Sequence, residues 1–212
     1  MARGRSGSGQ RSGRSKPSNP YRKPDRFTQQ AKDEGYAARS VYKLTEIQKR
    51  FRVLAQNQRV VDLGCSPGSW LAYVAQVVGG RGLVVGVDIN EPKVQPGPIL
   101  VKSVLEVTAE ELMEALGGER AQVLLSDMAP LTTGNTDADH YAQIELATRA
   151  FELALEVLAP GGAFVCKVFD GEDAHAFVQR VRASFTETRR VRPEAVRQNS
   201  REFFVVAKGF TG

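Results

Sequence analysis

The residues with the clearest chemical pattern form a glycine-rich turn, followed at a distance by an aspartate. The turn lies in VVDLGCSPGSW, residues 60–70, where Gly64 and Gly68 follow an apolar β-branched run and precede a helical stretch. Asp88 ends the run LVVGVD, 20 residues after Gly68. In an open α/β sheet, such a turn lets the backbone approach a bound nucleoside, and the acidic side chain can accept hydrogen bonds from its ribose hydroxyls. The pattern predicts a nucleoside-containing cofactor.

The spacing of the two glycines bears on which cofactor is bound. Gly64 and Gly68 are separated by three residues, whereas the turn that cradles a pyrophosphate has the pattern G-x-G-x-x-G. A ligand without phosphates is therefore favoured, and S-adenosylmethionine is such a ligand. A dinucleotide such as NAD, and a plain turn without any ligand, are the alternatives that this motif leaves open.

Three reactive side chains are expected at the same edge of the sheet as this turn. Asp127 ends the apolar run VLLSD, Lys167 lies near the end of AFVCKVF, and Glu202 begins EFFVVA. Ligands on open α/β sheets bind at the carboxyl ends of the parallel strands. If the strand that begins at Glu202 runs antiparallel, its first residue lies at that edge as well. An amine and two carboxylates beside a cofactor turn are suited to proton transfer, although each of them alone is also typical of a strand end.

The elements that must position these residues alternate along the chain. We expect a first helix over residues 28–51, with Ser40 as a candidate N-cap. Strands are then predicted at residues 59–64, 83–88, 99–102, 122–127 and 162–168, and helices at residues 68–78, 108–116, 141–158 and 173–184. This alternation predicts an α/β fold with a doubly wound, Rossmann-like sheet that is mainly parallel. The last two strands, at residues 185–192 and 202–208, are joined by a short polar loop and are expected to pair antiparallel.

Charge is distributed unevenly along the 212 residues. The first 26 residues are rich in Gly, Ser and Arg and carry a net charge of +7, whereas the remaining residues carry −2. With almost no apolar side chain, this segment cannot bury enough surface to fold. We therefore expect a disordered basic tail over residues 1–26 and one domain over residues 27–212. Basic tails bind phosphate backbones by releasing counterions, and the alternative is a tail that serves solubility alone.

The cysteines, the histidines and the lengths of the apolar runs indicate whether the chain is a disulfide-bonded, a metal-binding or a membrane protein. Cys65 and Cys166 lie in or beside apolar strand patterns and are expected to be buried free thiols. His140 and His175 lack the spacing of metal ligands and are expected at the surface or as helix caps, so no metal site is predicted. No apolar run approaches the roughly 18 residues of a membrane span, and the N-terminus lacks the apolar block of a signal peptide. We expect a cytoplasmic monomer without membrane contact.

Five segments of the chain together resemble one known family. They are ARSVYKLTEIQKRF, VVDLGCSPGSW, SDMAP, LAPGGAFVCKVF and SREFFVVAKG, in this order, and the resemblance runs from about residue 27 to residue 210. They are similar to segments of the FtsJ/RrmJ family of RNA ribose 2′-O-methyltransferases. Within that family, the strongest similarity is to bacterial members that methylate a uridine of large-subunit ribosomal RNA. The resemblance implies a methyltransferase domain with S-adenosylmethionine as cofactor, and ribosomal RNA or the large ribosomal subunit as partner.

The resemblance also implies roles for particular residues. The family uses a Lys-Asp-Lys-Glu tetrad for catalysis, which corresponds here to Lys43 in VYKL, Asp127 in SDMAP, Lys167 in CKVF and Glu202 in SREFF. Lys167 is the best candidate for the base that removes a hydroxyl proton. An ordinary lysine, with a pKa of about 10.4, is protonated at neutral pH, so desolvation or a neighbouring positive charge must favour the neutral amine. A ribose 2′-hydroxyl needs such a base, and it is present in RNA but not in DNA.

The cofactor contacts of the family can be carried over in the same way. They fall on Gly68, Trp70, Asp88 and Asp127. One contact differs, because relatives have an acidic residue near the adenine, after the third strand, where this chain has Ser103. Backbone groups or Glu106 are the candidates to replace it.

Basic residues of the first helical segment are expected to extend a phosphate-binding surface, unless they form only a solvated face. They are Arg39, Lys49, Arg50 and Arg52. Three other functions stay open at this point. They are the same chemistry on another RNA such as tRNA or a capped 5′ end, a non-enzymatic RNA-binding factor of ribosome assembly, and a nicotinamide-dependent oxidoreductase. The glycine spacing disfavours the last of these.

Overall fold

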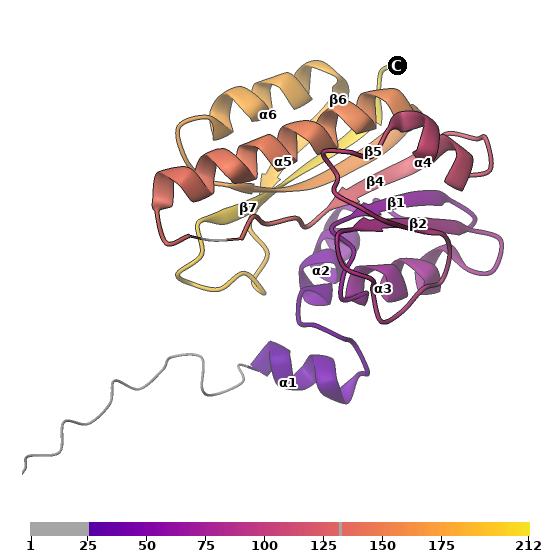
Figure 1. The fold of residues 1–212 in the computed structure, drawn as a ribbon, viewed down its shortest axis with the longest axis horizontal. Helices are drawn as coiled ribbons and strands as arrows, with labels where there is room; N and C mark the ends of the chain where they lie inside the picture. Colours follow the sequence, from indigo (N-terminus) through magenta and orange to yellow (C-terminus); the bar gives the residue numbers. More distant parts are fainter. Residues whose placement is uncertain (1–25, 132) are drawn as a thin grey trace, which may run out of the picture.

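The computed structural model describes residues 26–131 and 133–212, which form a sheet with helices on both sides (Figure 1). Over these residues the sheet has seven strands in the order β3-β2-β1-β4-β5-β7-β6. The strands are β1 (Arg59–Leu63), β2 (Leu83–Asp88), β3 (Ile99–Val101), β4 (Ala121–Ser126), β5 (Leu158–Phe169), β6 (Phe185–Val191) and β7 (Glu202–Phe210). The helices are α1 (Arg26–Asp33), α2 (Val41–Phe51), α3 (Ser69–Val78), α4 (Ala109–Ala115), α5 (Thr136–Val157) and α6 (Ala174–Ala183).

The strand directions confirm the predicted fold class. From β3 through β2, β1 and β4 to β5, neighbouring strands pair in parallel. The C-terminal strand β7 is antiparallel to both of its neighbours, β5 and β6. The sheet is therefore doubly wound and mainly parallel, and its last two strands pair antiparallel as expected.

The order of the strands fixes where a ligand can bind. It reverses between β1 and β4, because the chain continues from β1 to β2 and β3 on one side and to β4 and β5 on the other. At such a point the connections after the two strands lead to opposite faces of the sheet, which leaves a crevice at the carboxyl ends. The glycine-rich turn follows β1 directly, and Asp127 follows β4 directly.

Two hydrophobic clusters cover the two faces of the sheet. Along β1, Val61 and Leu63 belong to the cluster that includes residues of α4, α5 and α6, whereas Val60 belongs to the cluster that includes residues of α2 and α3. Figure 1 shows α5 and α6 on one side of the sheet and α2 and α3 on the other. A strand that is buried on both faces requires apolar residues at consecutive positions. The burial of these residues accounts for the apolar positions of β1, which only the buried Asp62 interrupts before the turn.

The prediction of one helix over residues 28–51 is wrong, because the helix is interrupted. α1 ends at Asp33 and α2 begins at Val41, with Gly35 between them at a φ of 78°. This left-handed conformation favours glycine and ends the helical path. A single glycine inside a helical pattern is often tolerated, so Gly35 alone did not indicate the break, although an N-cap at Ser40 agrees with a new helix starting at Val41. Ser40 precedes α2 as predicted, but its side chain makes no capping hydrogen bond.

The other elements lie within a few residues of their predicted positions, apart from two early starts. The helix predicted at residues 141–158 begins at Thr136, where the Asn135 side chain accepts hydrogen bonds from the N–H groups of Asp137 and Ala138. The first turn of this helix is polar and has no apolar periodicity. The prediction, which relied on that periodicity, therefore placed the start of the helix too late in the chain. β5 likewise begins at Leu158, before the predicted strand at residues 162–168.

Two predictions concern the ends of the chain and the membrane. The predicted tail over residues 1–26 lies outside the described residues, except for Arg26, which begins α1. None of the helices in the described part of the chain combines the length and the apolar character of a membrane span.

Candidate active site

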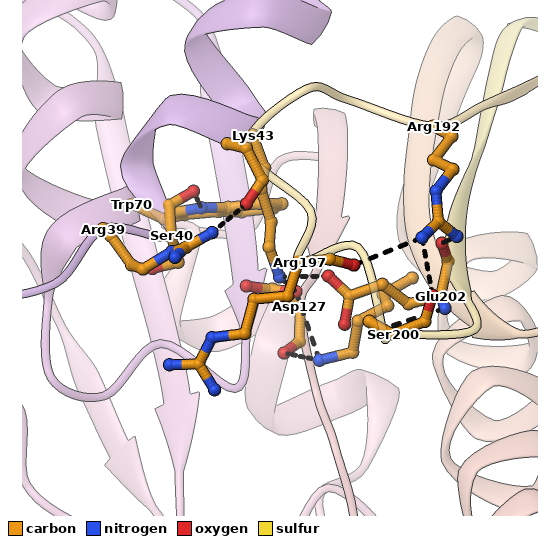
Figure 2. A network of polar contacts seen from close by, with 11 residues as sticks. Arg39, Ser40, Lys43, Trp70, Asp127, Arg192, Arg197, Ser200 and Glu202 are labelled. Atoms are coloured by element: carbon orange, nitrogen blue, oxygen red, sulfur yellow. Dashed lines mark hydrogen bonds and ion pairs between the residues drawn. The ribbon is translucent and has the colours of Figure 1, made fainter. Parts of the chain in front are cut away.

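Four charged side chains from distant parts of the chain meet at the carboxyl edge of the sheet. They are Lys43 on α2, Asp127 after β4, Lys167 near the end of β5, and Glu202 at the start of β7. Nζ of Lys43 lies 2.7 Å from Oε1 of Glu202 and 3.4 Å from Oδ1 of Asp127. Nζ of Lys167 lies 3.2 Å from the same oxygen of Asp127. The structure thus brings the four predicted residues together, and Figure 2 shows Lys43, Asp127 and Glu202 beside one another.

The pairing of β5 with β7 delivers two of these residues to the same edge. Glu202 pairs with Phe169, the last residue of β5, and Lys167 pairs with Phe204. The ring of Phe204 lies 5.6 Å from Nζ of Lys43, at a distance that allows a cation–π contact. The antiparallel direction of β7 therefore places a carboxylate and an aromatic ring next to the end of a parallel strand.

Trp70 connects this cluster to the start of α2. Its ring packs against Phe204, with centroids 6.0 Å apart, and its Nε1 donates a hydrogen bond to the main-chain carbonyl of Ser40 at 2.9 Å. Ser40 lies directly before α2, the helix that carries Lys43. The buried indole therefore fixes the position of α2 relative to β7.

The environment of Lys43 keeps its ammonium group charged. Burial acts to lower the pKa of Lys43, but the nearby carboxylates of Asp127 and Glu202 outweigh burial, so the pKa is raised above its ordinary value. A lysine that is protonated at neutral pH cannot accept a proton. Its three N–H groups can instead hold an oxygen atom that approaches the cluster.

A buried glutamine that the sequence did not single out supports the end of β5. Nε2 of Gln143, on α5, donates to the main-chain carbonyl of Lys167 at 2.6 Å, and its Oε1 accepts from the N–H of Phe169 at 2.9 Å. The side chain is 1% exposed. The sequence did contain a signal for this role of Gln143, since it is a polar residue among apolar ones on the buried side of the helix. A buried amide needs hydrogen-bond partners.

A cavity of about 600 Å³ opens beside the glycine-rich turn. Ser66 and Asp88 line it on the side of β1 and β2, and Met128 lines it after β4. The carboxylate of Asp88 accepts hydrogen bonds from the main-chain N–H groups of Ser66, at 3.0 Å, and Asn90, at 2.8 Å. These bonds fix a carboxylate in the wall of the cavity. The size of the cavity and its mixed apolar and polar lining suit a nucleoside.

The close approach of two backbone segments explains why the turn contains glycine at position 64. Gly64 has a φ of 79°, and a Cβ atom at this position would lie 2.6 Å from Cγ of Met128. A larger residue would therefore strain the backbone and displace Met128, which lines the cavity. The cavity depends on the absence of this side chain.

Of the four predicted cofactor residues, only Asp88 lines this cavity, whereas Gly68, Trp70 and Asp127 do not. Gly68 precedes α3 at a φ of 111°, and Trp70 is 3% exposed with its indole turned toward Ser40. The groups near them that can hold an anionic part of a ligand are the main-chain amides at the start of α3. Near the place expected for the adenine, Ser103, Val104 and Leu105 line the cavity, and Glu106 does not.

A buried acid lies beneath the turn. Asp62 on β1 is 1% exposed, and neither of its carboxyl oxygens has a hydrogen-bond partner. Burial raises the pKa of Asp62 well above its ordinary value, and the negative charges of Asp127 and Asp88 raise it further. Asp127 and Asp88 thus favour the neutral form of Asp62, and their own charges give this edge a negative potential that suits a ligand with positive charge.

A second cavity, of about 360 Å³, adjoins the charged cluster. Lys43 and Glu202 line it, together with Arg39 from the segment before α2 and Arg197 from the loop before β7. Of the other basic residues predicted to form a phosphate-binding surface, Arg50 pairs with Glu46 at 3.2 Å, and Lys49 and Arg52 do not line the cavity. The basic residues that line this cavity are Lys43 and Arg39, which were predicted from the sequence, and Arg197, which was not.

The cysteines and histidines take the following positions. Cys65 and Cys166 are buried free thiols, as predicted. His175 is exposed, whereas the surface position considered for His140 is wrong, since His140 is 6% exposed and accepts a hydrogen bond from the N–H of Asp173. Within the described residues, no group of three or more His, Cys, Asp or Glu side chains could hold a metal ion.

Comparisons with known proteins give a consistent result. The family model of FtsJ-like methyltransferases matches residues 36–210. The chain is 43% identical over 185 residues to "Ribosomal RNA large subunit methyltransferase E" of Desulfatibacillum aliphaticivorans, which covers 86% of this chain and 88% of that protein. It is 44% identical over 205 residues to the protein of the same name from Sorangium cellulosum, with coverage of 93% and 95%.

Two solved structures share the fold. A chain from Plasmodium falciparum, described as a ribosomal RNA methyltransferase, has a TM-score of 0.74 and 22% identity and covers 84% of this chain and 100% of its own length. Fibrillarin from Aeropyrum pernix, in complex with S-adenosyl-L-methionine, has a TM-score of 0.57 and 16% identity, with coverage of 79% and 76%.

Proposed function

As a member of the FtsJ-like methyltransferase family, the chain is an S-adenosylmethionine-dependent methyltransferase, and we propose that it methylates the 2′-hydroxyl of a uridine in large-subunit (23S) ribosomal RNA. Two curated relatives that align with most of the chain are named for large-subunit ribosomal RNA. The lysine and carboxylate side chains in one cluster support a hydroxyl acceptor, because a hydroxyl must lose a proton to a base during the reaction.

The observation that carries this proposal is that two residues of the charged cluster line one cavity, while the chain neighbour of a third lines another. Met128, the residue after Asp127, lines the larger cavity, whereas Lys43 and Glu202 line the smaller one. A methyl donor in the first cavity and a ribose in the second would therefore meet at the same four side chains. This arrangement holds two reactants in place beside a base, which is what such a reaction requires of a protein.

Each of the four side chains has a proposed role. S-adenosylmethionine supplies an electrophilic methyl group on a positively charged sulfur. Lys167 accepts the proton of the attacking hydroxyl, while Asp127 orients the Lys167 amine through the contacts at 2.7 and 3.2 Å. Lys43, kept positive by its neighbours, holds the acceptor oxygen. Glu202 orients Lys43 through the contact at 2.7 Å.

The larger cavity and the residues beside it provide groups for each part of the cofactor. We assign the ribose hydroxyls to the Asp88 carboxylate, and the carboxylate of the methionine part to the main-chain amides around Gly68 and Trp70. Asp127 lies beside the donor methyl group in this assignment, and its negative charge favours a cation. The apolar residues that line the cavity near Ser103 enclose the adenine.

We propose the large ribosomal subunit or its RNA as partner, and a monomer that acts in the cytoplasm. The basic segment over residues 1–26 would add contacts to the phosphate backbone. The same site could act on another RNA, such as tRNA or a capped 5′ end, or the protein could serve ribosome assembly without catalysis. These alternatives differ in whether, and where, a methyl group is transferred.

The test is to incubate the protein with large subunits from cells that lack it, using S-adenosylmethionine with a labelled methyl group, and to map the labelled nucleotide. We expect label on the 2′-oxygen of one uridine, and no label with Lys167→Ala. Label on added tRNA alone would indicate a different acceptor, and binding without any label would indicate an assembly factor.

A further inference from the structure

The smaller cavity contains two arginines that come from different parts of the chain. Arg39 lies in the segment before α2, and Arg197 lies in the loop over residues 192–201 that leads to β7. Asn199 and Ser200 of the same loop also line the cavity. Figure 2 shows both arginines close to the catalytic cluster. Lys43 and the carboxylate of Glu202 complete the charged lining, so positive groups outnumber the one negative group around this space.

The two guanidinium groups interact unfavourably with each other. Burial lowers the pKa of Arg39 below its ordinary value and the charge of Arg197 lowers it further, while Glu202 acts in the opposite direction. Arg39 is nevertheless held in place, because Nη2 donates a hydrogen bond to the main-chain carbonyl of Ala195. An anion that contacts both guanidinium groups would relieve their repulsion and would be bound more strongly than by either group alone.

A third arginine keeps the loop that carries Arg197 in one conformation. The guanidinium of Arg192 donates hydrogen bonds to four main-chain carbonyls (Figure 2). These are the carbonyls of Arg197 at 3.2 Å, Gln198 at 3.4 Å, Ser200 at 2.6 Å and Glu202 at 3.0 Å. Because one side chain contacts both ends of the segment, Arg197 and the catalytic Glu202 are fixed relative to each other. The binding groups are therefore ordered before a ligand arrives, which reduces the entropy cost of binding.

We propose that Arg39 and Arg197 together bind one phosphodiester group of the RNA strand, next to the ribose that is methylated. This inference rests on the proposed function, since it places the acceptor strand in the smaller cavity. Arginine presents a planar fork of N–H groups that matches phosphate oxygens, and two arginines can contact different oxygens of the same group. A phosphate is a few bonds away from the 2′-hydroxyl of its own nucleotide, so holding it also limits where that hydroxyl can lie.

The proposal separates two kinds of contact with RNA. General contacts of the basic tail would strengthen binding without placing any particular ribose. The Arg39–Arg197 pair lies beside Lys43 and Glu202, so its phosphate would set the position of the reactive nucleotide. Loss of this pair should therefore impair binding of the acceptor, and should leave cofactor binding unchanged.

The experiment compares Arg197→Gln with Arg81→Gln, which removes the same charge from an exposed position before β2, at the opposite end of the sheet. Binding to large subunits is measured at several salt concentrations, together with the KM for subunits in methyl transfer and the Kd for S-adenosylmethionine. For Arg197→Gln, we expect the Kd and KM for subunits to rise roughly tenfold or more, with an unchanged cofactor Kd. The slope of log Kd against log salt concentration should decrease by about one, which corresponds to the loss of one phosphate contact. Arg197→Lys should bind subunits more strongly than Arg197→Gln.

Three outcomes would overturn the proposal. The first is a Kd for subunits that is the same in Arg197→Gln and Arg81→Gln, the second is an unchanged salt dependence, and the third is a cofactor Kd that rises as much as the subunit Kd. Since binding is measured without turnover, the experiment remains informative if the wild-type protein transfers no methyl group to subunits. In that case the proposed function fails, and the binding data still decide whether the two arginines hold a phosphate.

Discussion

Nζ of Lys167 makes two contacts with a single residue, Asp127: it donates to the main-chain carbonyl at 2.7 Å and lies 3.2 Å from the carboxylate. A lysine ammonium has three N–H groups, so these contacts occupy two of its three directions. The third direction is the one in which a neutral amine carries its lone pair. The two contacts with Asp127 thus determine where the lone pair of a deprotonated Lys167 points, which supports its proposed role as the base.

Replacement of Lys167 should abolish most of the activity. Lys167→Ala removes the proposed base, so the methyl-transfer rate should fall by about 10²–10⁴-fold. Lys167→Arg retains positive charge, but an arginine does not release its proton in proteins, so it should be almost as inactive. Single-turnover methyl transfer to subunits measures both. Substantial activity in Lys167→Arg would argue against proton transfer to this residue.

Removal of Glu202 should have a smaller effect than removal of Asp127. The carboxylate of Asp127 lies 3.4 Å from Nζ of Lys43 and 3.2 Å from Nζ of Lys167. The carboxylate of Glu202 forms an ion pair with Lys43 but not with Lys167. We expect Asp127→Ala to lose nearly all turnover and Glu202→Ala to lose roughly tenfold, because the role proposed for Glu202 is to orient. The comparison uses turnover at saturating subunit and cofactor. Equal losses would contradict the division of roles.

The buried acid Asp62 should reduce stability at neutral pH. Because its pKa is raised in the folded protein, its contribution favours folding most below the unfolded pKa of about 3.9, and this contribution is lost as the pH rises through the folded pKa. Without cofactor, Asp62→Asn should therefore raise the free energy of unfolding at pH 7.5 by about 1–3 kcal/mol, with a smaller gain at pH 5. Urea unfolding measures it, with the exposed Glu114→Gln as control. A gain that does not depend on pH would exclude this explanation.

Gly64 and Gly79 offer a matched pair of substitutions. Both have a positive φ, of 79° and 71°, but a Cβ would collide with Met128 at position 64 and would meet nothing within 4 Å at position 79. Both Gly→Ala variants should lose about 1–2 kcal/mol of stability from backbone strain. Gly64→Ala alone should also weaken S-adenosylmethionine binding, by about tenfold or more, measured by calorimetry. Equal cofactor affinities of the two variants would show that Met128 moves away without narrowing the cavity.

The two cysteines should not react in the folded protein. Burial raises the pKa of Cys166 to about 12 and raises that of Cys65 strongly as well. Only the thiolate reacts readily with disulfide reagents, so we expect less than one thiol per chain to react at pH 8 within minutes, and two after denaturation. A colorimetric thiol assay measures this. Fast reaction of one thiol in the folded state would indicate that the glycine-rich turn around Cys65 opens.

Much of the fold and part of the site could be predicted from the sequence. Asp127, Lys167 and Glu202 could be predicted because the ends of apolar runs mark the ends of strands, and parallel strands end at the same edge of the sheet. The place of Lys43 was implied by resemblance alone, since nothing in a helical pattern shows which strand end the helix will reach. Gln143 and Arg197 were missed, because their roles depend on contacts between distant segments. The same reason applies to Trp70, whose position under α2 is fixed by Ser40 and Phe204.

The place of β7 between β5 and β6 has a consequence for how the protein is made. During synthesis β6 leaves the ribosome before β7, yet β7 is the strand that joins β6 to the rest of the sheet. Until β7 inserts, one edge of β5 is unpaired, and such an edge is a point at which incomplete chains associate wrongly. The same insertion carries Glu202 to the cluster, so the last strand to be synthesised completes both the sheet pairing and the set of charged groups in the site.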